Sequence, residues 1–240
     1  MHHLSIVLPA YNEEENIAAL ASELSGVVPV LHGEWEVECI FVDDGSSDAT
    51  LEQMLATRER HPELGVRIIT LSRNWGLTAA MAAGFQAARG DVVATLDTDL
   101  QNDPQDLPKL LAELGEADVA IGIRVHRRDT FVKRASSRIA NSLRNWATQE
   151  DIIDTGCSLK VYRKEYLDRL KLFTGLHRFL PTLLKLEGAR VVQVPVNHRP
   201  RTRGVAKYHL ANRLAGPLLD LLAVRWMQKR HLGYCAKELP

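Results

Sequence analysis

Short apolar segments that alternate with helix-forming segments restrict the fold of this 240-residue chain more than any other feature. Five of these apolar segments occur in the first half, at residues 4–8, 36–42, 66–71, 92–96 and 119–121. Segments of this length, rich in Val and Ile, are typical of strands that are buried on both faces of a parallel sheet. Their alternation with helical segments predicts βαβ units, and therefore an α/β fold with a mostly parallel central sheet.

Local signals predict where strands and helices begin and end. We expect Pro9 to end the first strand and Asn12 to cap the helix that follows. After the second strand, Gly45 permits a tight turn, and Asp48 or the serine before it is expected to cap the next helix.

Polar residues follow three of the predicted strands, at residues 9–12, 43–46 and 97–101. In open α/β sheets, ligands bind beside the carboxyl ends of the strands. Each segment alone could be an ordinary solvated turn, but three of them at one edge of one sheet favour a shared nucleotide site. The chain contains neither a Gly-x-Gly-x-x-Gly pattern nor a Gly-Lys-Ser/Thr loop, which argues against NAD dehydrogenases and P-loop NTPases.

The segment after the fourth strand contains two aspartates and a glutamine in alternate positions. If the backbone stays extended there, Asp97, Asp99 and Gln101 point to the same side. Two carboxylates and an amide oxygen are suited to Mg²⁺ or Mn²⁺. The alternative is an acidic strand-to-helix turn, in which Asp103 is the N-cap of the next helix and Pro104 its first residue.

The net charge of zero hides a strong asymmetry between the two halves of the chain. Residues 1–120 contain 6 Lys and Arg against 21 Asp and Glu, a net charge of −15, whereas residues 121–240 contain 24 against 9, a net charge of +15. An acidic half and a basic half fit a metal-and-nucleotide lobe joined to a surface that binds anions. Charge alone does not distinguish nucleic acid, phosphorylated substrates and anionic membrane.

The basic residues of the second half gather in two segments. Within residues 124–144, Arg134 and Arg138 are one helical turn apart and share a face, although a solvated basic helix face is the alternative. Residues 198–208 read as a basic loop suited to phosphate oxygens.

The last leucine-rich segment, residues 214–227, is too short and too charged to span a bilayer. It is expected either to lie at a membrane interface or to pack on the domain as an ordinary amphipathic helix. The three cysteines have no metal-ligand spacing and residues 4–8 are too short for a signal peptide, so a cytosolic compartment is expected.

Taken in order, these segments resemble the family 2 glycosyltransferases, and within them the polyprenyl-phosphate group, which includes dolichyl-phosphate mannosyltransferases and undecaprenyl-phosphate sugar transferases. The resemblance extends from about residue 4 to about residue 227 and rests on residues 6–14, 42–48, 73–76, 96–101, 154–157 and 198–208. It implies a nucleotide-diphospho-sugar transferase (GT-A type) Rossmann-like domain with C-terminal amphipathic helices.

The resemblance also implies roles for individual residues. The nucleotide would be held by Pro9, Tyr11, Glu13, Asp44, Asp97 and Thr98. The metal, Mg²⁺ or Mn²⁺, would be held by Asp97, Asp99 and Gln101. Cations for the donor diphosphate or the acceptor phosphate would be Arg124, Arg134, Arg138, Arg201 and Lys207. The sequence departs from the family pattern in two ways. Val205 and Ala206 precede Lys207, where the family commonly has a serine, and no segment matches the two transmembrane helices of some members.

The activity implied by this resemblance is metal-dependent, inverting transfer of a sugar from a UDP- or GDP-sugar to a polyprenyl phosphate at the cytoplasmic membrane face. Its catalytic residues would be Asp99, Asp154, Arg124 and Arg138. A phosphate acceptor is already an anion, whereas a saccharide or lipid-linked hydroxyl acceptor needs a base, for which Asp154 is the candidate. A non-catalytic nucleotide-binding membrane scaffold is a further alternative.

The expected organisation is a catalytic domain at residues 1–210 followed by an amphipathic tail at residues 211–240. Within the domain, residues 1–122 form the nucleotide and metal lobe and residues 123–210 the acceptor lobe. No nucleic-acid partner is expected because no recognised reader motif is present. A homo-oligomer and a separate membrane-protein partner are both left open.

Overall fold

A seven-stranded sheet forms the centre of the computed structural model, which describes residues 1–125, 141–142, 144–200 and 215–232. Its strand order is β3-β2-β1-β4-β6-β5-β7, and β6 runs antiparallel to both of its neighbours while the other pairs are parallel. The prediction of an α/β fold with a mostly parallel sheet is therefore confirmed. The strands are β1 His2–Ala10, β2 Trp35–Asp43, β3 Arg67–Thr70, β4 Val92–Thr95, β5 Val119–Arg124, β6 Lys160–Arg163 and β7 Val191–Val196.

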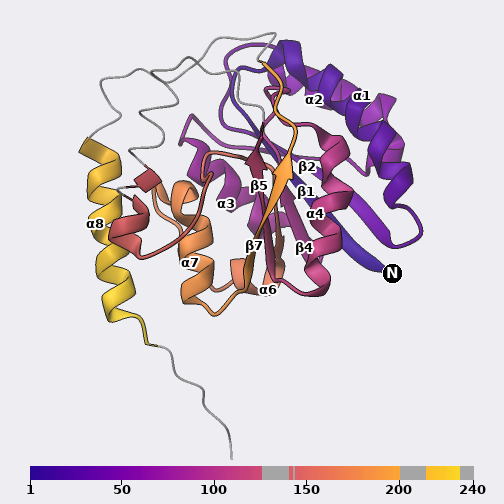
Figure 1. Cartoon of the computed structure of the whole chain (residues 1–240). Helices are drawn as coiled ribbons and strands as arrows, with labels where there is room; N and C mark the ends of the chain where they lie inside the picture. Colours follow the sequence, from indigo (N-terminus) through magenta and orange to yellow (C-terminus); the bar gives the residue numbers. More distant parts are fainter. Residues whose placement is uncertain (126–140, 143, 201–214, 233–240) are drawn as a thin grey trace, which may run out of the picture.

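Helices cover both faces of this sheet (Figure 1). The α-helices are α1 Glu14–Leu31, α2 Thr50–Arg60, α3 Leu77–Ala87, α4 Leu107–Ala112, α6 Lys164–Leu167, α7 Leu180–Leu186 and α8 Ala215–Arg230. The 3-10 segments are η1 Pro62–Leu64, η2 Pro104–Asp106, η3 Glu113–Gly115 and η4 Leu176–Phe179. Residues 141–142 and 144–148 are also helical.

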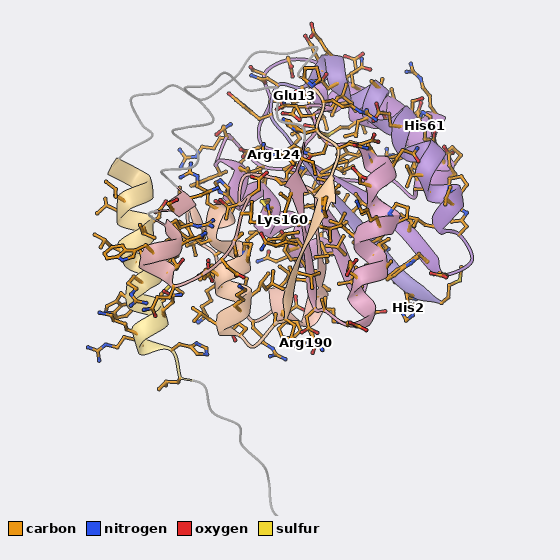
Figure 2. All side chains as sticks on the ribbon, in the orientation of Figure 1. His2, Glu13, His61, Arg124, Lys160 and Arg190 are labelled. Carbon is orange, nitrogen blue, oxygen red and sulfur yellow. The ribbon has the colours of Figure 1, made fainter. Side chains whose placement is uncertain are left out.

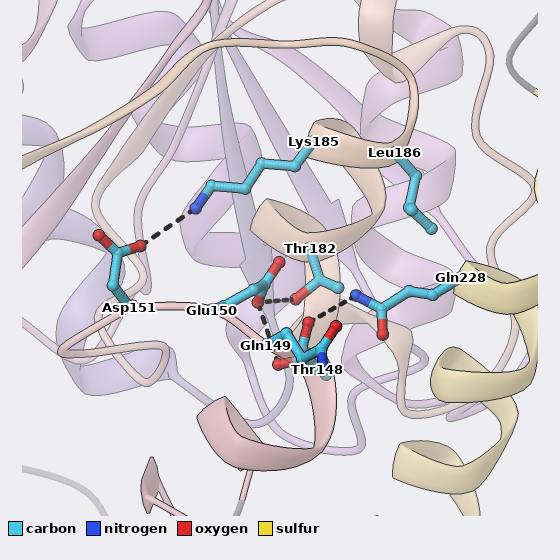
Figure 3. A pocket seen from close by; sticks show the side chains of 8 residues that line it. All are labelled: Thr148, Gln149, Glu150, Asp151, Thr182, Lys185, Leu186 and Gln228. Carbon is cyan, nitrogen blue, oxygen red and sulfur yellow. Dashed lines mark hydrogen bonds and ion pairs between the residues drawn. The ribbon is translucent and has the colours of Figure 1, made fainter.

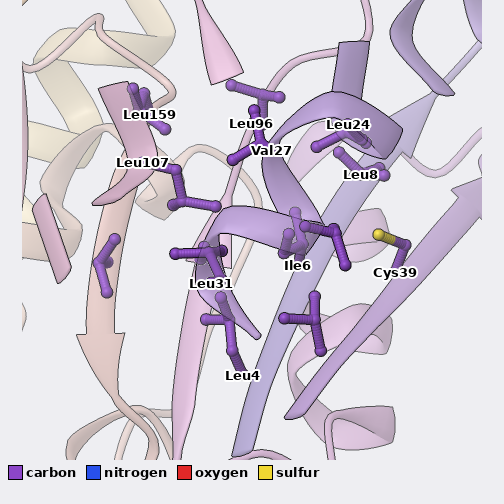
Figure 4. Packing of buried hydrophobic residues seen from close by; sticks show 14 of the residues in the cluster. Leu4, Ile6, Leu8, Leu24, Val27, Leu31, Cys39, Leu96, Leu107 and Leu159 are labelled. Atoms are coloured by element: carbon purple, nitrogen blue, oxygen red, sulfur yellow. The ribbon is translucent and has the colours of Figure 1, made fainter. Parts of the chain in front are cut away.

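The alternation of side chains along the strands divides the core into two layers. On one face, Leu4, Ile6 and Leu8 of β1 pack in a cluster with residues of α1 and α4 (Figure 4). On the other face, Val7 packs in a cluster with residues of α3 and α7. Both faces of β1 are therefore buried from Leu4 onward, as expected for a strand in the middle of such a sheet.

The prediction that Pro9 ends the first strand is wrong, because β1 continues through Ala10. The Pro9 carbonyl accepts a hydrogen bond from Thr98 Oγ1 at 3.2 Å, on the side of β1 that faces β4. The β1–β4 ladder extends only to the pair Val7 and Thr95. An N–H at position 9 would point to the same side, beyond this ladder, so proline costs the sheet no hydrogen bond.

Asn12 does not cap α1, contrary to the prediction. The helix begins at Glu14 with no side-chain cap, and Asn12 has a left-handed backbone with φ of 51°. Its side-chain oxygen instead accepts a hydrogen bond from Ser47 N at 2.8 Å, which joins the loop after β1 to the loop after β2. The N-cap of α2 is Ala49, so the prediction that Asp48 or Ser47 caps this helix is also wrong, although Asp48 accepts a hydrogen bond from Thr50 N at 3.0 Å.

Helix α8 packs against the described part of the domain through one side. Leu221 and Val224 are buried in a cluster with Leu176, Phe179 and Leu183 of η4 and α7. A second side of α8 is apolar and exposed, formed by Leu218, Leu219, Leu222 and Trp226. None of the helices in the described ranges is long and apolar enough to cross a membrane.

Helix α3 lies very close to β1 at Gly84. A substitution at this position therefore tests the packing between the two elements. A Cβ at Gly84 would lie 2.3 Å from Val7 Cγ1. We expect Gly84→Ala to destabilise the fold by about 1–3 kcal/mol through overpacking, despite alanine's better helix propensity. Urea unfolding followed by far-UV circular dichroism measures this change.

Gly26→Ala in α1 is the matched control, because the nearest atom to its added Cβ is 3.9 Å away. Here the helix propensity alone acts, and a gain of roughly 0.5–1 kcal/mol is expected. Equal effects of the two substitutions would contradict the tight approach of α3 to β1.

Candidate functional site

Hydrogen bonds join the three polar loops at the carboxyl ends of β1, β2 and β4. Asp44 N donates to Ala10 O at 2.9 Å, and Asn12 N donates to Ser46 Oγ at 2.9 Å. Thr98, which follows β4, donates to Pro9 O. The prediction that these loops share one edge of the sheet is confirmed, and together they form one polar surface.

Asp44 organises the loop at one end of this surface. Its two carboxylate oxygens accept hydrogen bonds from Trp75 N at 2.7 Å and Gly76 N at 2.8 Å. Burial raises the pKa of the Asp44 carboxyl, and these two backbone bonds counteract part of that rise. A Cβ on Gly45 would lie 2.4 Å from the carbonyl carbon of Arg73, so glycine is required where residues 45 and 73–76 meet.

The other predicted nucleotide residues lie around Asp44. Pro9 and Thr98 are buried, while Tyr11 and Glu13 are partly exposed. Asn16 Nδ2 donates to Glu13 Oε2 at 2.6 Å, which orients the Glu13 carboxylate. Trp75 is 53% exposed, and the Arg73 guanidinium lies 3.9 Å from the centre of its ring. Trp75 belongs to one of the motifs in the sequence, but no role of its own was predicted for it.

The backbone after β4 does not stay extended, so the reason given for placing Asp97, Asp99 and Gln101 on one side is wrong. Residues 98–100 form a turn in which Leu100 has φ of 61°. The turn is closed by Gln101 N, which donates to Asp99 Oδ1 at 3.1 Å. The Asp103 alternative also occurs, because its carboxylate accepts from Gln105 N at the start of η2.

Asp97 and Asp99 nevertheless form a carboxylate pair that fits a divalent cation. Burial, and then the charge of Asp99, raise the pKa of Asp97 to about 6. A bound cation would relieve this repulsion, and carboxylate oxygens are the donors that Mg²⁺ and Mn²⁺ prefer. Within the described residues no cluster of three or more His, Cys, Asp or Glu side chains could hold a metal.

The antiparallel strand β6 brings the loop at residues 154–158 to the same edge. Because β6 runs against β4, its first residue, Lys160, lies at the end where the parallel strands finish. Figure 2 shows Glu13, Arg124 and Lys160 toward this edge, whereas His2 and Arg190 lie toward the opposite one. Ser158 Oγ accepts from Asp97 N at 3.1 Å and so connects this loop to the aspartate pair.

Arg124 and Asp154 form a two-point ion pair in this loop. Arg124 Nε and Nη2 donate to the two Asp154 oxygens at 2.7 and 2.8 Å. Gly156 N also donates to Asp154 at 3.2 Å. Asp154 is only 4% exposed. A carboxylate held in this way orients a guanidinium well and is poorly suited to abstract a proton.

Lys160 is a residue of this site that sequence reasoning missed. It is 4% exposed, and burial lowers the pKa of its ammonium, while the charges of Asp97 and Asp154 act in the opposite direction. Its Nζ donates to the Cys157 carbonyl. A lysine inside the otherwise apolar segment 159–162 was the available signal.

The segment after β7 is joined to the aspartate loop. Arg199 N donates to Gln101 O at 2.8 Å, and the Arg199 guanidinium pairs with Glu23 at 2.7 Å and with Asp103 at 2.8 Å. Arg199 is thus engaged by acidic side chains, although its basic segment was expected to bind phosphate. The predicted phosphate residues Arg134, Arg138, Arg201 and Lys207 lie outside the described residues.

A cavity of about 510 Å³ opens elsewhere, between the loop at residues 149–151, α7 and α8 (Figure 3). The cavity is lined by Thr148, Gln149, Glu150, Asp151, Thr182, Lys185, Leu186 and Gln228. None of these is a predicted site residue. The polar surface at the carboxyl edge of the sheet therefore remains the candidate active site.

This fold and acidic edge are those of a sugar-nucleotide transferase, and the family model for glycosyl transferase family 2 matches residues 5–171. The chain belongs to this family. It is 39% identical over 231 residues to the dodecaprenyl-phosphate galacturonate synthase of Rhizobium johnstonii, covering 94% of this chain and 67% of that relative. It is 34% identical over 223 residues to the undecaprenyl-phosphate 4-deoxy-4-formamido-L-arabinose transferase of an Enterobacter species, covering 92% and 67%.

Solved structures agree with the fold. Glucosyl-3-phosphoglycerate synthase from Mycobacterium tuberculosis, in complex with Mn²⁺, UDP and glucosyl-3-phosphoglycerate, matches with a TM-score of 0.66 and 20% identity. The match covers 95% of this chain and 80% of that chain. This chain spans about two thirds of the length of the two sequence relatives.

The raised pKa of Asp97 predicts how metal-free protein responds to pH. Its pKa is about 6 in the folded protein against a model value of 3.8, so ionising Asp97 costs stability as the pH rises from about 4 to 6. Asp97→Asn should therefore stabilise the EDTA-treated protein at pH 7.5, by roughly 1–3 kcal/mol, and not at pH 4. Urea titrations at the two pH values measure this difference.

Asp91→Asn, an exposed acid just before β4, is the control and should change stability little at either pH. Saturating Mg²⁺ or Mn²⁺ should reverse the order and favour the wild type at pH 7.5. A destabilising Asp97→Asn in EDTA at pH 7.5 would contradict the raised pKa.

Proposed function

We propose that this chain transfers a sugar, with inversion, from a UDP- or GDP-sugar to a polyprenyl phosphate in a metal-dependent reaction. The observation that carries the proposal is the meeting of the Asp97–Asp99 carboxylate pair and the Arg124–Asp154 ion pair at one edge of the sheet. The two sequence relatives, whose printed names specify polyprenyl-phosphate sugar chemistry, support the choice of acceptor.

The donor occupies the end of the site around Asp44. Pro9, Tyr11, Glu13 and Asp44 hold the nucleoside, while Thr98 fixes the β4 loop against β1 through its bond to Pro9. Asp97, Asp99 and Gln101 would hold Mg²⁺ or Mn²⁺. When bound, the cation supplies positive charge opposite the leaving nucleotide diphosphate.

The acceptor approaches from the side of Arg124. A polyprenyl phosphate oxygen is already negative at neutral pH, so the chain must position it rather than deprotonate it. Asp154 fixes the plane of the Arg124 guanidinium through the two-point ion pair, and Arg124 attracts the acceptor phosphate. Arg134, Arg138, Arg201 and Lys207 are the further cations proposed for this phosphate.

A hydroxyl acceptor is the second candidate, and the geometry disfavours it. It would require a general base, for which the sequence offered Asp154. The Asp154 carboxylate is instead engaged by Arg124 and by the N–H of Gly156. A non-catalytic scaffold is also disfavoured, because it gives no reason to place two mutually repelling aspartates beside each other.

We further propose that α8 places the enzyme peripherally on the cytoplasmic face of a membrane. The exposed apolar side of α8 is bordered by Arg225, Lys229 and Arg230, which would face anionic headgroups. In this arrangement residues 1–122 bind donor and metal, residues 123–210 bind the acceptor, and residues 211–240 form the interfacial tail. A homo-oligomer or a membrane-protein partner stays a prediction.

Transfer from radiolabelled UDP- and GDP-sugars to undecaprenyl and dolichyl phosphate tests the reaction. We expect labelled lipid with Mg²⁺ or Mn²⁺ and none with EDTA. Asp99→Asn should reduce the rate by roughly 100-fold or more, by analogy with the loss of one transition-state stabiliser. NMR of the product should give the anomer opposite to that of the donor.

Asp91→Asn is the control for the loss of an acidic side chain and should retain full activity. Donor hydrolysis without labelled lipid would point to a hydroxyl acceptor, and failure of folded protein to bind any donor would favour the scaffold.

Co-sedimentation with anionic liposomes tests the surface on α8. Replacing both Leu219 and Leu222, which are 66% and 67% exposed, by serine should weaken binding by roughly tenfold or more, because both side chains would otherwise leave water. Raising the salt concentration should also weaken binding. Replacing two exposed apolar residues of α1 and α2, Val30 and Leu55, is the control and should have no effect.

A further inference from the structure

The hydroxyl of Thr78 joins α3 to the segment that carries η4. Thr78 is the second residue of α3 and is 6% exposed. Its Oγ1 lies 2.7 Å from His177 Nδ1 and accepts a hydrogen bond from Gly175 N at 3.1 Å. Two elements almost 100 residues apart in sequence are thus joined by one buried hydroxyl.

The direction of the Thr78–His177 hydrogen bond follows from the charge of the histidine. Burial, followed by the charges of Arg178 and Lys160, lowers the pKa of His177 to about 4, so the imidazole is neutral at physiological pH. A neutral imidazole has one acceptor nitrogen, and we assign this role to Nδ1: the Thr78 O–H then donates to Nδ1, the Thr78 oxygen accepts from Gly175 N, and His177 carries its proton on Nε2. Both hydrogen-bonding capacities of the hydroxyl are therefore used.

Thr78 lies just beyond the loop that Asp44 holds. Residues 73–76 are the last part of the connection from β3 to α3, and the N–H groups of Trp75 and Gly76 donate to the Asp44 carboxylate. The two amides that Asp44 binds therefore directly precede Leu77, the first residue of α3. Anything that shifts the start of α3 alters the position of the two amides relative to Asp44.

The same segment that binds Thr78 also supports α8. Gly175 has φ of 93°, and a Cβ there would lie 2.2 Å from Asp220 Oδ2 of α8. Asp220 lies 3.8 Å from Arg178 Nη1, and Leu176 packs with Leu221 and Val224 of α8. Residues 175–178 therefore contact α8 on one side and the start of α3 on the other.

We propose that Thr78 and His177 are positioning residues for the nucleotide end of the site. Through them, the packing of α8 on residues 175–178 is coupled to the affinity for a nucleoside diphosphate. The identity of the ligand rests on the proposed function. The connection from α3 to α8 through Thr78 and residues 175–178, called the tether below, does not. Coupling of this kind is reciprocal, so a nucleoside diphosphate that stabilises residues 73–76 also favours the packing of α8 on residues 175–178.

Equilibrium binding of UDP and GDP to the full chain, with Mg²⁺ or Mn²⁺, tests the role of Thr78. Thr78→Val removes the hydroxyl at constant shape and leaves His177 Nδ1 and Gly175 N without this partner. We expect the dissociation constant to rise roughly 3- to 10-fold. In the transfer assay, KM for the donor should rise while kcat stays nearly constant.

Conservative variants separate positioning from a general loss of stability. Thr78→Ser keeps the hydroxyl and should restore binding, and His177→Asn, which offers an acceptor oxygen near Nδ1, should bind better than His177→Leu. Thr182→Val is the matched control, because it removes a buried helical hydroxyl that donates to Glu150 at 2.6 Å. It should lower stability without changing nucleotide affinity.

Two glycine substitutions test the connection to α8. Gly175→Ala and Gly188→Ala carry a similar backbone penalty, since φ is 93° and 90°, but only the first places a Cβ against Asp220. Gly175→Ala should weaken nucleotide binding by roughly threefold or more, and Gly188→Ala should leave it unchanged. Equal effects of the two would overturn the coupling to α8.

Hydrogen exchange in ligand-free protein distinguishes failure of the tether from failure of the proposed function. Thr78→Val should accelerate exchange of the Trp75, Gly76 and Gly175 amides, and Thr182→Val should not. Unchanged exchange at these amides would overturn the tether whatever the protein binds. If the wild type bound no nucleoside diphosphate, the proposed function and the coupling to it would both be overturned, while faster exchange would still establish the tether.

Discussion

Charge balance at the carboxyl edge of the sheet is the constraint on which the rest of the structure depends. Asp99 and Asp154 are 8% and 4% exposed, and burial of a carboxylate is costly unless it is compensated. Arg124 compensates Asp154 directly, and the buried Lys160 lies where it acts on both Asp97 and Asp154. Among these five side chains, three carboxylates against two cations leave one formal negative charge. That excess, concentrated on the Asp97–Asp99 pair, suits a divalent cation that arrives with a diphosphate.

The strands and the edge that carries the site could be predicted from the sequence, because apolar segments and polar loops follow simple periodic rules. Three details could not. Pro9 stays in β1 because the neighbouring ladder stops short of it, which depends on strand order. Asn12 bonds to Ser47 across two loops instead of capping its own helix, which depends on a contact 35 residues away. Lys160 reaches the site because β6 runs antiparallel, a reversal that no local pattern encodes.

The Arg124–Asp154 pair also favours one of the two chemistries that the sequence left open. A free carboxylate at position 154 would suit a hydroxyl acceptor, because that reaction needs a base. Two guanidinium bonds and the Gly156 N–H instead engage both oxygens of Asp154, so this carboxylate orients Arg124. An acceptor that arrives already ionised makes such a support sufficient, and positioning then replaces proton transfer as the task of this side of the site.

The contacts of residues 175–178 bear on how donor and lipid acceptor are brought together. If α8 binds a membrane as proposed, an enzyme with a nucleotide donor in water and an acceptor in that membrane gains when donor binding and membrane binding by α8 favour each other. The neutral His177 holds α3 through Thr78, while Gly175 contacts Asp220 of α8. A charged imidazole could not accept the Thr78 hydrogen bond at Nδ1, so burial keeps the histidine in its useful form. The connection is short, buried and fully hydrogen-bonded at Thr78. A connection with these properties moves as a unit, so a displacement of α8 also displaces the start of α3.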